Sequence, residues 1–254
     1  MEFEIWVLAL LCCAYFAAGF IDSAAGGGGL ITVPSLLIAN IPPDLALGTN
    51  KLVLALSMPA SLITYAKSGF VLWRLAAVGI PVTLLSGMAG TKALLFFHTE
   101  TIGRIILFLL PIAIVVTLMP KKDSGTVSET PTTTSSARMI LICVFIGFYE
   151  GFFGPGAGSF FILGLHHFIG LGLIQSSATA KVLNLPTVIS SLFVFILSGK
   201  VLYMAALPLA AASIVGYITG SRMAISIGPA YIRKMLSFVM TLLMASLIWK
   251  FYLS

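Results

Sequence analysis

The sequence consists almost entirely of apolar segments, and this feature leaves few folds open. A membrane-spanning helix needs about 20 apolar residues, so 254 residues could supply roughly eight to ten spans. Only helices and closed barrels satisfy their backbone in lipid, and no alternating strand pattern is present. The sequence therefore predicts an all-α polytopic membrane protein. The expected segments are 5–21, 30–40, 45–66, 71–97, 102–119, 138–153, 158–173, 176–198, 201–222 and 231–252.

The composition excludes several other classes of protein. Charged residues make up 9% of the chain, against about 25% in soluble domains, and the mean hydropathy is +1.10. The basic residues are scattered near segment ends instead of forming the patch that nucleic acid requires. Cys12, Cys13 and Cys143 lie in apolar stretches without metal-ligand spacing. We expect the lipid bilayer as partner, no nucleic acid, no metal and no cofactor.

A polar stretch divides the chain into two parts of similar length. It contains two lysines, an aspartate, many Ser and Thr residues and Pro131, a composition typical of a solvated linker. We predict a first membrane repeat at 1–120, a flexible cytoplasmic linker at 121–137 and a second membrane repeat at 138–254.

The two parts match each other at ordered positions. Gly26 and Gly28 correspond to Gly154 and Gly156 with an offset of 128 residues. The series continues with offsets of 128 to 130: Gly19 with Gly147, Thr49 with Thr179, Lys51 with Lys181, Gly69 with Gly199, Gly90 with Gly220 and Arg104 with Arg233. An ordered series in one register indicates an internal repeat.

The number of spans in each part predicts that the repeats are inverted. Each part has five apolar segments, of which the first two could form a broken, re-entrant hairpin followed by three transmembrane helices, giving eight spans plus half-helices. Three or five crossings are both odd, so the second part would be upside down. With the linker in the cytoplasm and both termini outside, this places most basic residues inside, as the positive-inside rule requires. Inside would lie Lys67, Arg74, Lys121, Lys122, Arg138, Arg222, Arg233 and Lys234, and outside Lys92, Arg104, Lys200 and Lys250.

Two glycine-rich motifs interrupt apolar segments at corresponding places in the repeats. Residues 26–29 are four consecutive glycines, and residues 154–158 read Gly-Pro-Gly-Ala-Gly. Such runs break helices, and the helix that follows would begin near mid-membrane, where its amino end attracts anions. Paired breaks in inverted repeats indicate a transporter's binding site, although single glycines commonly serve close helix packing instead. The predicted backbone contacts are Gly27, Gly28, Gly29, Gly156 and Gly158.

A second pair of motifs carries cations. Thr49-Asn50-Lys51 corresponds to Thr179-Ala180-Lys181, which Asn184 follows. A single lysine here would be explained by snorkelling to the interface, but a matched pair behind matched breaks favours contact with an anion. We predict that Lys51 and Lys181 bind the anion and that neutral side chains donate further hydrogen bonds: Thr49, Asn50, Ser159, Thr179 and Asn184. The two half-sites would differ, because Asn50 corresponds to Ala180.

Two carboxylates lie at the edges of the breaks. Asp22 precedes the first glycine cluster and Glu150 precedes the second. They could cap the following turns or carry a coupling proton, and the sequence leaves both roles open.

The residues at 19–34, 46–52, 147–159 and 178–183 together resemble the TauE/SafE sulfite and sulfonate exporter family, also called the toluene-sulfonate uptake permease family. The resemblance covers nearly the whole chain outside the linker. It implies a carrier in the bacterial cytoplasmic (inner) membrane with about eight spans. It also implies sulfite, sulfonates such as sulfoacetate, or related organic anions as substrates.

We therefore expect a secondary transporter, most simply an exporter, that works by alternating access on a small anion. Proton- or sodium-coupled uptake and a passive anion channel remain alternatives. An enzyme is not expected, because no metalloprotease, nucleotide-binding or nucleophile motif is present. A homodimer is compatible with the sequence.

Overall fold

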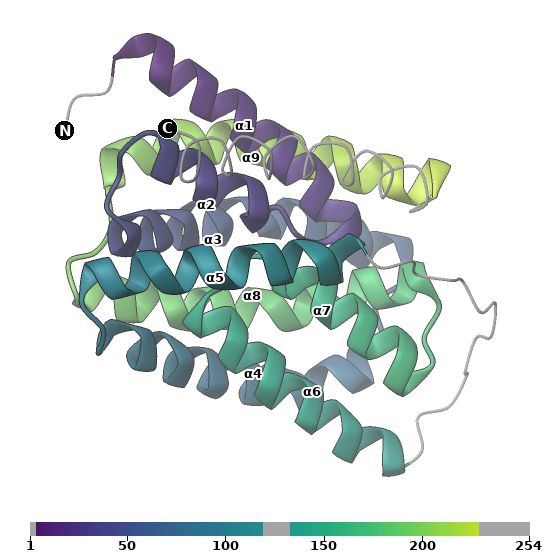
Figure 1. Ribbon diagram of the computed structural model, residues 1–254. Coiled ribbons are helices and arrows are strands. Elements are labelled where there is room, and N and C mark those ends of the chain that lie inside the picture. The colour runs from purple at the N-terminus through teal and green to yellow at the C-terminus, as the bar shows by residue number, and fades with distance from the viewer. Residues whose placement is uncertain (1–3, 119–132, 229–254) are drawn as a thin grey trace.

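The computed structural model describes residues 4–118 and 133–228, which fold into helices joined by short connections and contain no strand (Figure 1). The first half contains α1 (Ile5–Ala25), α2 (Gly29–Ile38), α3 (Pro43–Ser68), α4 (Trp73–Leu95) and α5 (Thr99–Leu118). The second half contains α6 (Thr133–Phe152), α7 (Ala157–Gly164) with a π-helical turn η1 (Leu165–Ile169), α8 (Leu173–Leu197) and α9 (Tyr203–Ile227).

The helices agree closely with the predicted segments. Helix α6 begins at Thr133, so the last residues of the predicted linker are helical. The rest of that linker (121–132) and the predicted segment 231–252 lie outside the described residues.

Within the described residues, five helices are long and apolar enough to cross a membrane: α1, α3, α4, α8 and α9. Helix α3 has 26 residues, about 39 Å at 1.5 Å per residue, which exceeds the hydrocarbon thickness of about 30 Å. Helix α2 and the helical stretch 157–169 are apolar but shorter. These lengths confirm a multi-pass helical membrane protein.

Helices α3 and α8 form the centre of the molecule and pack against each other. The outer helices pair across the halves, α1 with α9 and α6 with α4, and α4 and α9 in turn pack on α8 and α3. Glycines allow these close approaches. A Cβ at Gly90 would lie 2.1 Å from Phe148 O, and one at Gly220 would lie 2.1 Å from Phe20 O. Gly90 and Gly220, which are equivalent in the repeat, therefore allow close packing at two equivalent interfaces, α4 on α6 and α9 on α1.

The two central helices run in opposite directions. Gly48, near the start of α3, lies against Lys200 O just beyond the end of α8. Leu202 N donates to Thr49 Oγ1 at 3.0 Å, and Leu72 N donates to Thr179 Oγ1 at 3.2 Å. Thr49 and Thr179 are equivalent in the repeat, and each accepts a hydrogen bond from the backbone just beyond the C-terminal end of the other central helix.

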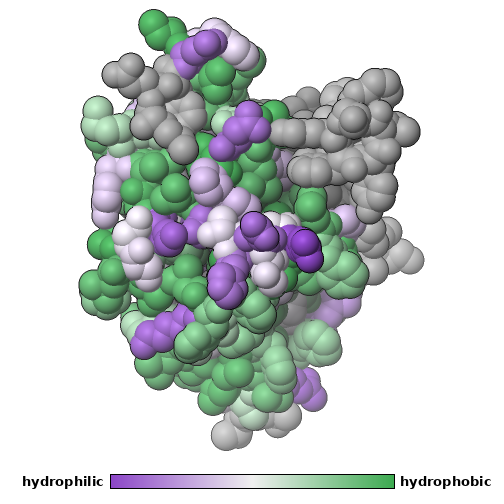
Figure 2. Space-filling model, turned by 60° about the vertical axis from the view of Figure 1, so that its left-hand side comes forward, coloured by the Kyte–Doolittle hydropathy of each residue, from purple (hydrophilic) through white to green (hydrophobic). Residues whose placement is uncertain are grey.

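Many large hydrophobic side chains of the described helices are exposed, as expected of a protein that faces lipid. Figure 2 views the side of the molecule that bears the α2–α3, α4–α5 and α8–α9 connections. Polar side chains gather near the middle of this face, with hydrophobic side chains above and below them (Figure 2).

Candidate functional site

Both predicted helix breaks are present. Helix α1 ends at Ala25, Gly26 and Gly27 take φ values of +73° and +95°, and α2 begins at Gly29. In the second half, Gly154 and Gly156 take +95° and +85° on either side of Pro155, and α7 begins at Ala157. These positive φ values favour glycine, so the glycine clusters are needed for the turns that interrupt the helices.

The two breaks lie directly against each other. A Cβ at Gly26 would lie 2.3 Å from Ser159 N, and one at Gly29 would lie 3.0 Å from Pro155 Cα. A side chain at Gly26 would therefore push the breaks apart. Segments about 130 residues apart in the sequence meet backbone to backbone at one point.

Side chains from other helices satisfy the carbonyl groups that the breaks leave open. A helix end leaves its last carbonyls without intrahelical partners. At the end of α1, Tyr65 donates to Ser23 O at 2.9 Å, and Ser177 donates to Ala24 O at 2.7 Å. Ser159 donates to Ala25 O at 2.9 Å. At the end of α6, Thr91 donates to Gly151 O at 2.8 Å.

Lys51 forms a buried ion pair with the carboxylate at the second break. Its Nζ lies 2.6 Å from Glu150 Oε1 and 2.7 Å from Glu150 O, and both side chains are only 3% exposed. The lysine belongs to α3 of the first half and the glutamate to α6 of the second. This pair therefore joins the halves.

Lys181 forms the equivalent pair with the carboxylate at the first break. Its Nζ lies 2.7 Å from Asp22 Oδ2, to which Tyr217 also donates a hydrogen bond. Asp22 Oδ1 accepts from Gly28 N at 2.8 Å. Asp22 thus accepts a hydrogen bond from the glycine turn of the first break and also pairs with Lys181. The two lysines and two carboxylates carry no net charge together.

A small enclosed cavity of about 20 Å³ lies between the breaks, room for about one water molecule. Two amide side chains reach it, Asn50 from α3 and Asn184 from α8. Tyr15 donates to Asn50 Oδ1 at 3.3 Å, whereas Asn184 Oδ1 is buried without a hydrogen-bond partner among the described residues. The Asn184 amide is a candidate ligand-binding group, because a buried polar group that is not fully paired costs stability. The lining residues are Asp22, Gly27, Gly29, Asn50, Leu54, Met58, Glu150, Gly154, Gly156, Gly158 and Asn184.

The two asparagines come from non-equivalent positions of the repeat. With the offset of 130 that relates Lys51 to Lys181, Asn50 corresponds to Ala180 and Leu54 to Asn184. Each half therefore contributes one amide, but one helical turn apart. The cavity is asymmetric although its surroundings are nearly symmetric.

The predicted site residues separate into three groups. Eight line the cavity: Gly27, Gly29, Asn50, Gly156, Gly158, Asn184 and the carboxylates Asp22 and Glu150. Lys51 and Lys181 lie behind the carboxylates and are bonded to them. Gly28, Thr49, Ser159 and Thr179 make the hydrogen bonds described above. A direct role in binding substrate stays a prediction for all three groups.

Several residues of the site could not be found from the sequence. Tyr217 on α9 and Tyr65 on α3 approach the break from helix positions that belong to no motif. Leu54 and Met58 complete the cavity wall. The only sequence feature that points to Leu54 and Met58 is their helical spacing from Asn50, since positions four and eight residues further on lie on the same helix face.

No group of three or more His, Cys, Asp or Glu residues that could hold a metal ion occurs in the part of the chain that the structure describes. The chemistry available at the breaks is therefore that of two cations, two carboxylates, two amides and glycine backbone.

A family model described as "Sulfite exporter TauE/SafE" matches residues 11–247. Two curated relatives cover nearly the whole chain. The "Probable membrane transporter protein ORF9" of Sinorhizobium sp is 37% identical over 92% of this chain and 89% of its own length. A "Probable membrane transporter protein" of Haemophilus influenzae is 36% identical over 95% of both chains.

A third relative is the "Probable membrane transporter protein YfcA" of Escherichia coli K12. It is 33% identical over 96% of this chain and 90% of its own length. No solved structure matches the chain.

Proposed function

The chain belongs to the sulfite exporter TauE/SafE family and is a membrane transporter, not an enzyme, and we propose that it carries small anions such as sulfite, sulfoacetate or other organosulfonates. The binding site is the space between the two helix breaks. Transport occurs by alternating access, in which the site opens to one side of the membrane at a time.

The observation that carries this proposal is the pair of ion pairs between the halves. Charged side chains inside a membrane protein are costly and usually functional, and here each lysine binds a carboxylate of the opposite half at 2.6–2.7 Å. A sulfonate or sulfite group offers the lysines what a carboxylate offers, namely negatively charged oxygens at hydrogen-bonding distance. Asp22 and Glu150 therefore occupy the lysine contacts that a substrate anion would use.

Substrate binding then proceeds by exchange of partners. An incoming anion oxygen replaces a carboxylate oxygen at Lys51 or Lys181, and the amides of Asn50 and Asn184 donate to its remaining oxygens. The cavity of about 20 Å³ is too small for a sulfonate group, so it must widen as the ion pairs part. Because those pairs connect the halves, binding and movement of the halves are coupled.

An inverted repeat fits this mechanism. The antiparallel course of α3 and α8, with equivalent threonines bonded to the far end of the opposite helix, supports two halves of opposite orientation. Reciprocal packing of α1 on α9 and α6 on α4 supports the same relation. We place the protein in the bacterial inner membrane with the linker in the cytoplasm and both termini outside, an arrangement in which each half crosses the membrane an odd number of times.

Export is the simpler direction. Moving one charge through 100 mV is worth about 2.3 kcal/mol, so a dianion leaving a negative cytoplasm gains roughly twice that amount. An exporter of sulfite or a sulfonate thus needs no coupling ion.

Proton-coupled uptake is the second candidate, and the ion pairs favour it specifically. A carboxylate that gives up its lysine would remain buried and unpaired, which is costly. Taking up a proton removes that charge, so Asp22 or Glu150 could carry one proton with each anion. An inward proton gradient that accelerates anion uptake into vesicles would support this candidate, and a flux that ignores the gradient would exclude it.

Flux measurements test the proposal. Purified protein in vesicles should move labelled sulfite or sulfoacetate, and Lys51→Ala or Lys181→Ala should abolish that flux. Lys200→Ala is the matched control, because Lys200 pairs with Asp44 at 2.7 Å but is 40% exposed and lies outside the cavity. Wild-type flux in both lysine variants would refute the assignment.

Binding can be tested without transport. In a thermal-shift screen of sulfite, sulfoacetate, taurine, thiosulfate and simple carboxylates, a ligand at one hundred times its dissociation constant stabilises the protein by about 2.7 kcal/mol. A carrier also predicts slow turnover without single-channel currents, and such currents would identify a channel instead.

A further inference from the structure

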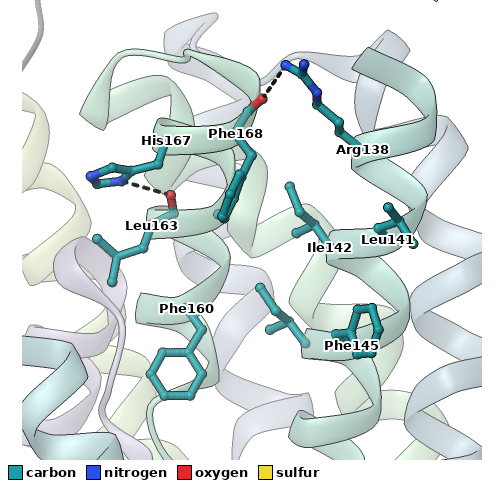
Figure 3. A pocket seen from close by; sticks show the side chains of 10 residues that line it. Arg138, Leu141, Ile142, Phe145, Phe160, Leu163, His167 and Phe168 are labelled. Carbon is teal, nitrogen blue, oxygen red and sulfur yellow. Dashed lines mark hydrogen bonds between the residues drawn. The ribbon is translucent and has the colours of Figure 1, made fainter. Parts of the chain in front are cut away.

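A large apolar groove lies away from the central site, between α6 and the segment formed by α7 and η1 (Figure 3). Its volume is about 900 Å³. The floor is close-packed, since a Cβ at Gly164 would lie 3.2 Å from Ile142 Cγ2. The groove is lined by Arg138, Leu141, Ile142, Phe145, Ile146, Phe160, Leu163, Gly164, His167 and Phe168.

The walls of the groove are made of hydrocarbon and are open to the surroundings. Phe145 is 70% exposed and Phe168 is 63% exposed. In a membrane protein such a surface meets lipid chains, so an apolar groove alone identifies no particular ligand.

One end of the groove is different because it is cationic. Arg138 is exposed and its Nη1 donates to Phe168 O at 3.3 Å, which joins α6 to η1 across that end (Figure 3). His167 Nδ1 lies 3.2 Å from Leu163 O one helical turn earlier. The guanidinium carries five N–H donors in a fixed fork, so donors beyond the one to Phe168 are available to a ligand.

Arg138 and His167 are not required by the fold. The repeat offset of 128 places Leu10 at the position equivalent to Arg138. With offsets of 128 to 130, His167 corresponds to Ala39, Ile38 or Leu37, all of which are apolar. The first half therefore builds the same pair of helices with only apolar residues at this end.

The dimensions of the groove suit one leaflet of a bilayer. Arg138 lies five residues from the start of α6, about 7.5 Å along the helix, next to the segment that connects the halves. From Arg138 to Ile146 the helix extends about 12 Å, close to the roughly 15 Å of hydrocarbon in one leaflet.

We propose that this groove binds an anionic phospholipid, with its phosphate on Arg138 and an acyl chain along Phe145 and Phe160. Arginine suits this role because its planar fork binds phosphate through two parallel hydrogen bonds. Basic pockets between transmembrane helices bind anionic headgroups in this way.

Native mass spectrometry of the full chain in detergent tests the proposal by titration with phosphatidylglycerol and phosphatidylcholine of identical chains. Wild type should prefer phosphatidylglycerol, and Arg138→Gln should reduce that preference by about fivefold or more. Leu163→Trp, which fills the groove without changing charge, should reduce binding of both lipids.

Lys92→Gln is the matched control. Lys92 is also exposed and also lies at an apolar groove, of about 410 Å³, but on α4. It should leave the preference unchanged. Equal binding of the two lipids to wild type, or a preference that survives Arg138→Gln, would overturn the proposal. An equal loss in Lys92→Gln would overturn it too, because the attraction would then come from diffuse charge.

Discussion

Removing Lys51 or Glu150 alone should destabilise the protein far more than removing both together. Their side chains are each 3% exposed and are joined at 2.6 Å, so deleting one leaves the other charged and buried without a partner. Breaking a buried pair in this way costs about 3–5 kcal/mol, whereas replacing both partners by uncharged groups of similar volume is often neutral.

The variants Lys51→Met and Glu150→Gln preserve the approximate size of each side chain. At about 2–4 °C per kcal/mol for a chain of this size, each single variant should melt roughly 6–20 °C below wild type. The double variant should melt near wild type. Thermal unfolding of the purified protein in detergent, followed by circular dichroism, measures all four proteins.

Lys200→Met is the control for loss of a lysine. Its pair with Asp44 is partly solvated, since the lysine is 40% exposed, and such pairs contribute about 0–1 kcal/mol. Its melting temperature should fall by less than about 4 °C. Single variants at Lys51 and Glu150 that melt like this control, or a double variant no more stable than the weaker single one, would refute the reasoning.

Three further predictions concern the breaks and the cavity. Gly26 and Gly69 have similar positive φ values, but of the two only Gly26 has a backbone neighbour within 4 Å. Gly26→Ala should therefore prevent folding or transport, whereas Gly69→Ala should lower the free energy of unfolding by only about 1–2 kcal/mol. Expression and melting of the two variants measure the difference. Thr49→Val and Thr179→Val should each destabilise the protein by about 1–3 kcal/mol, because each leaves a backbone amide without its acceptor. The two losses should be similar, and unequal denaturation midpoints would contradict the equivalence of the two contacts. Asn184→Leu should leave stability unchanged or raise it, because it removes a buried unpaired oxygen. It should also reduce anion flux, because it removes the amide N–H donors proposed to bind the anion; a folded variant with wild-type flux would exclude the amide from the site.

Much of the fold could be predicted from the sequence because lipid restricts the backbone to few choices. Long apolar runs predict α3 and α8 with ends correct to within a few residues. The helix breaks were predictable for a different reason, namely that consecutive glycines and Gly-Pro-Gly disfavour a continuous helix.

The partners of the site residues could not be predicted. The repeat identified Lys51, Lys181, Asp22 and Glu150, but sequence offers no means of deciding which lysine meets which carboxylate. The pairs cross between the halves, Lys51 to Glu150 and Lys181 to Asp22, a tertiary arrangement that no local pattern encodes. Tyr217 was missed for the same reason, since it is one aromatic residue among many on an apolar helix.

The central claim is that Lys51 and Lys181 exchange their carboxylates for the transported anion. The most direct test is sulfoacetate or sulfite flux in vesicles for two double variants, Lys51→Met with Glu150→Gln and Lys181→Met with Asp22→Asn, in which each ion pair is removed whole and the fold is retained. We predict that both variants melt near wild type and that their flux falls to the background of empty vesicles. Wild-type flux through either folded double variant would contradict the claim.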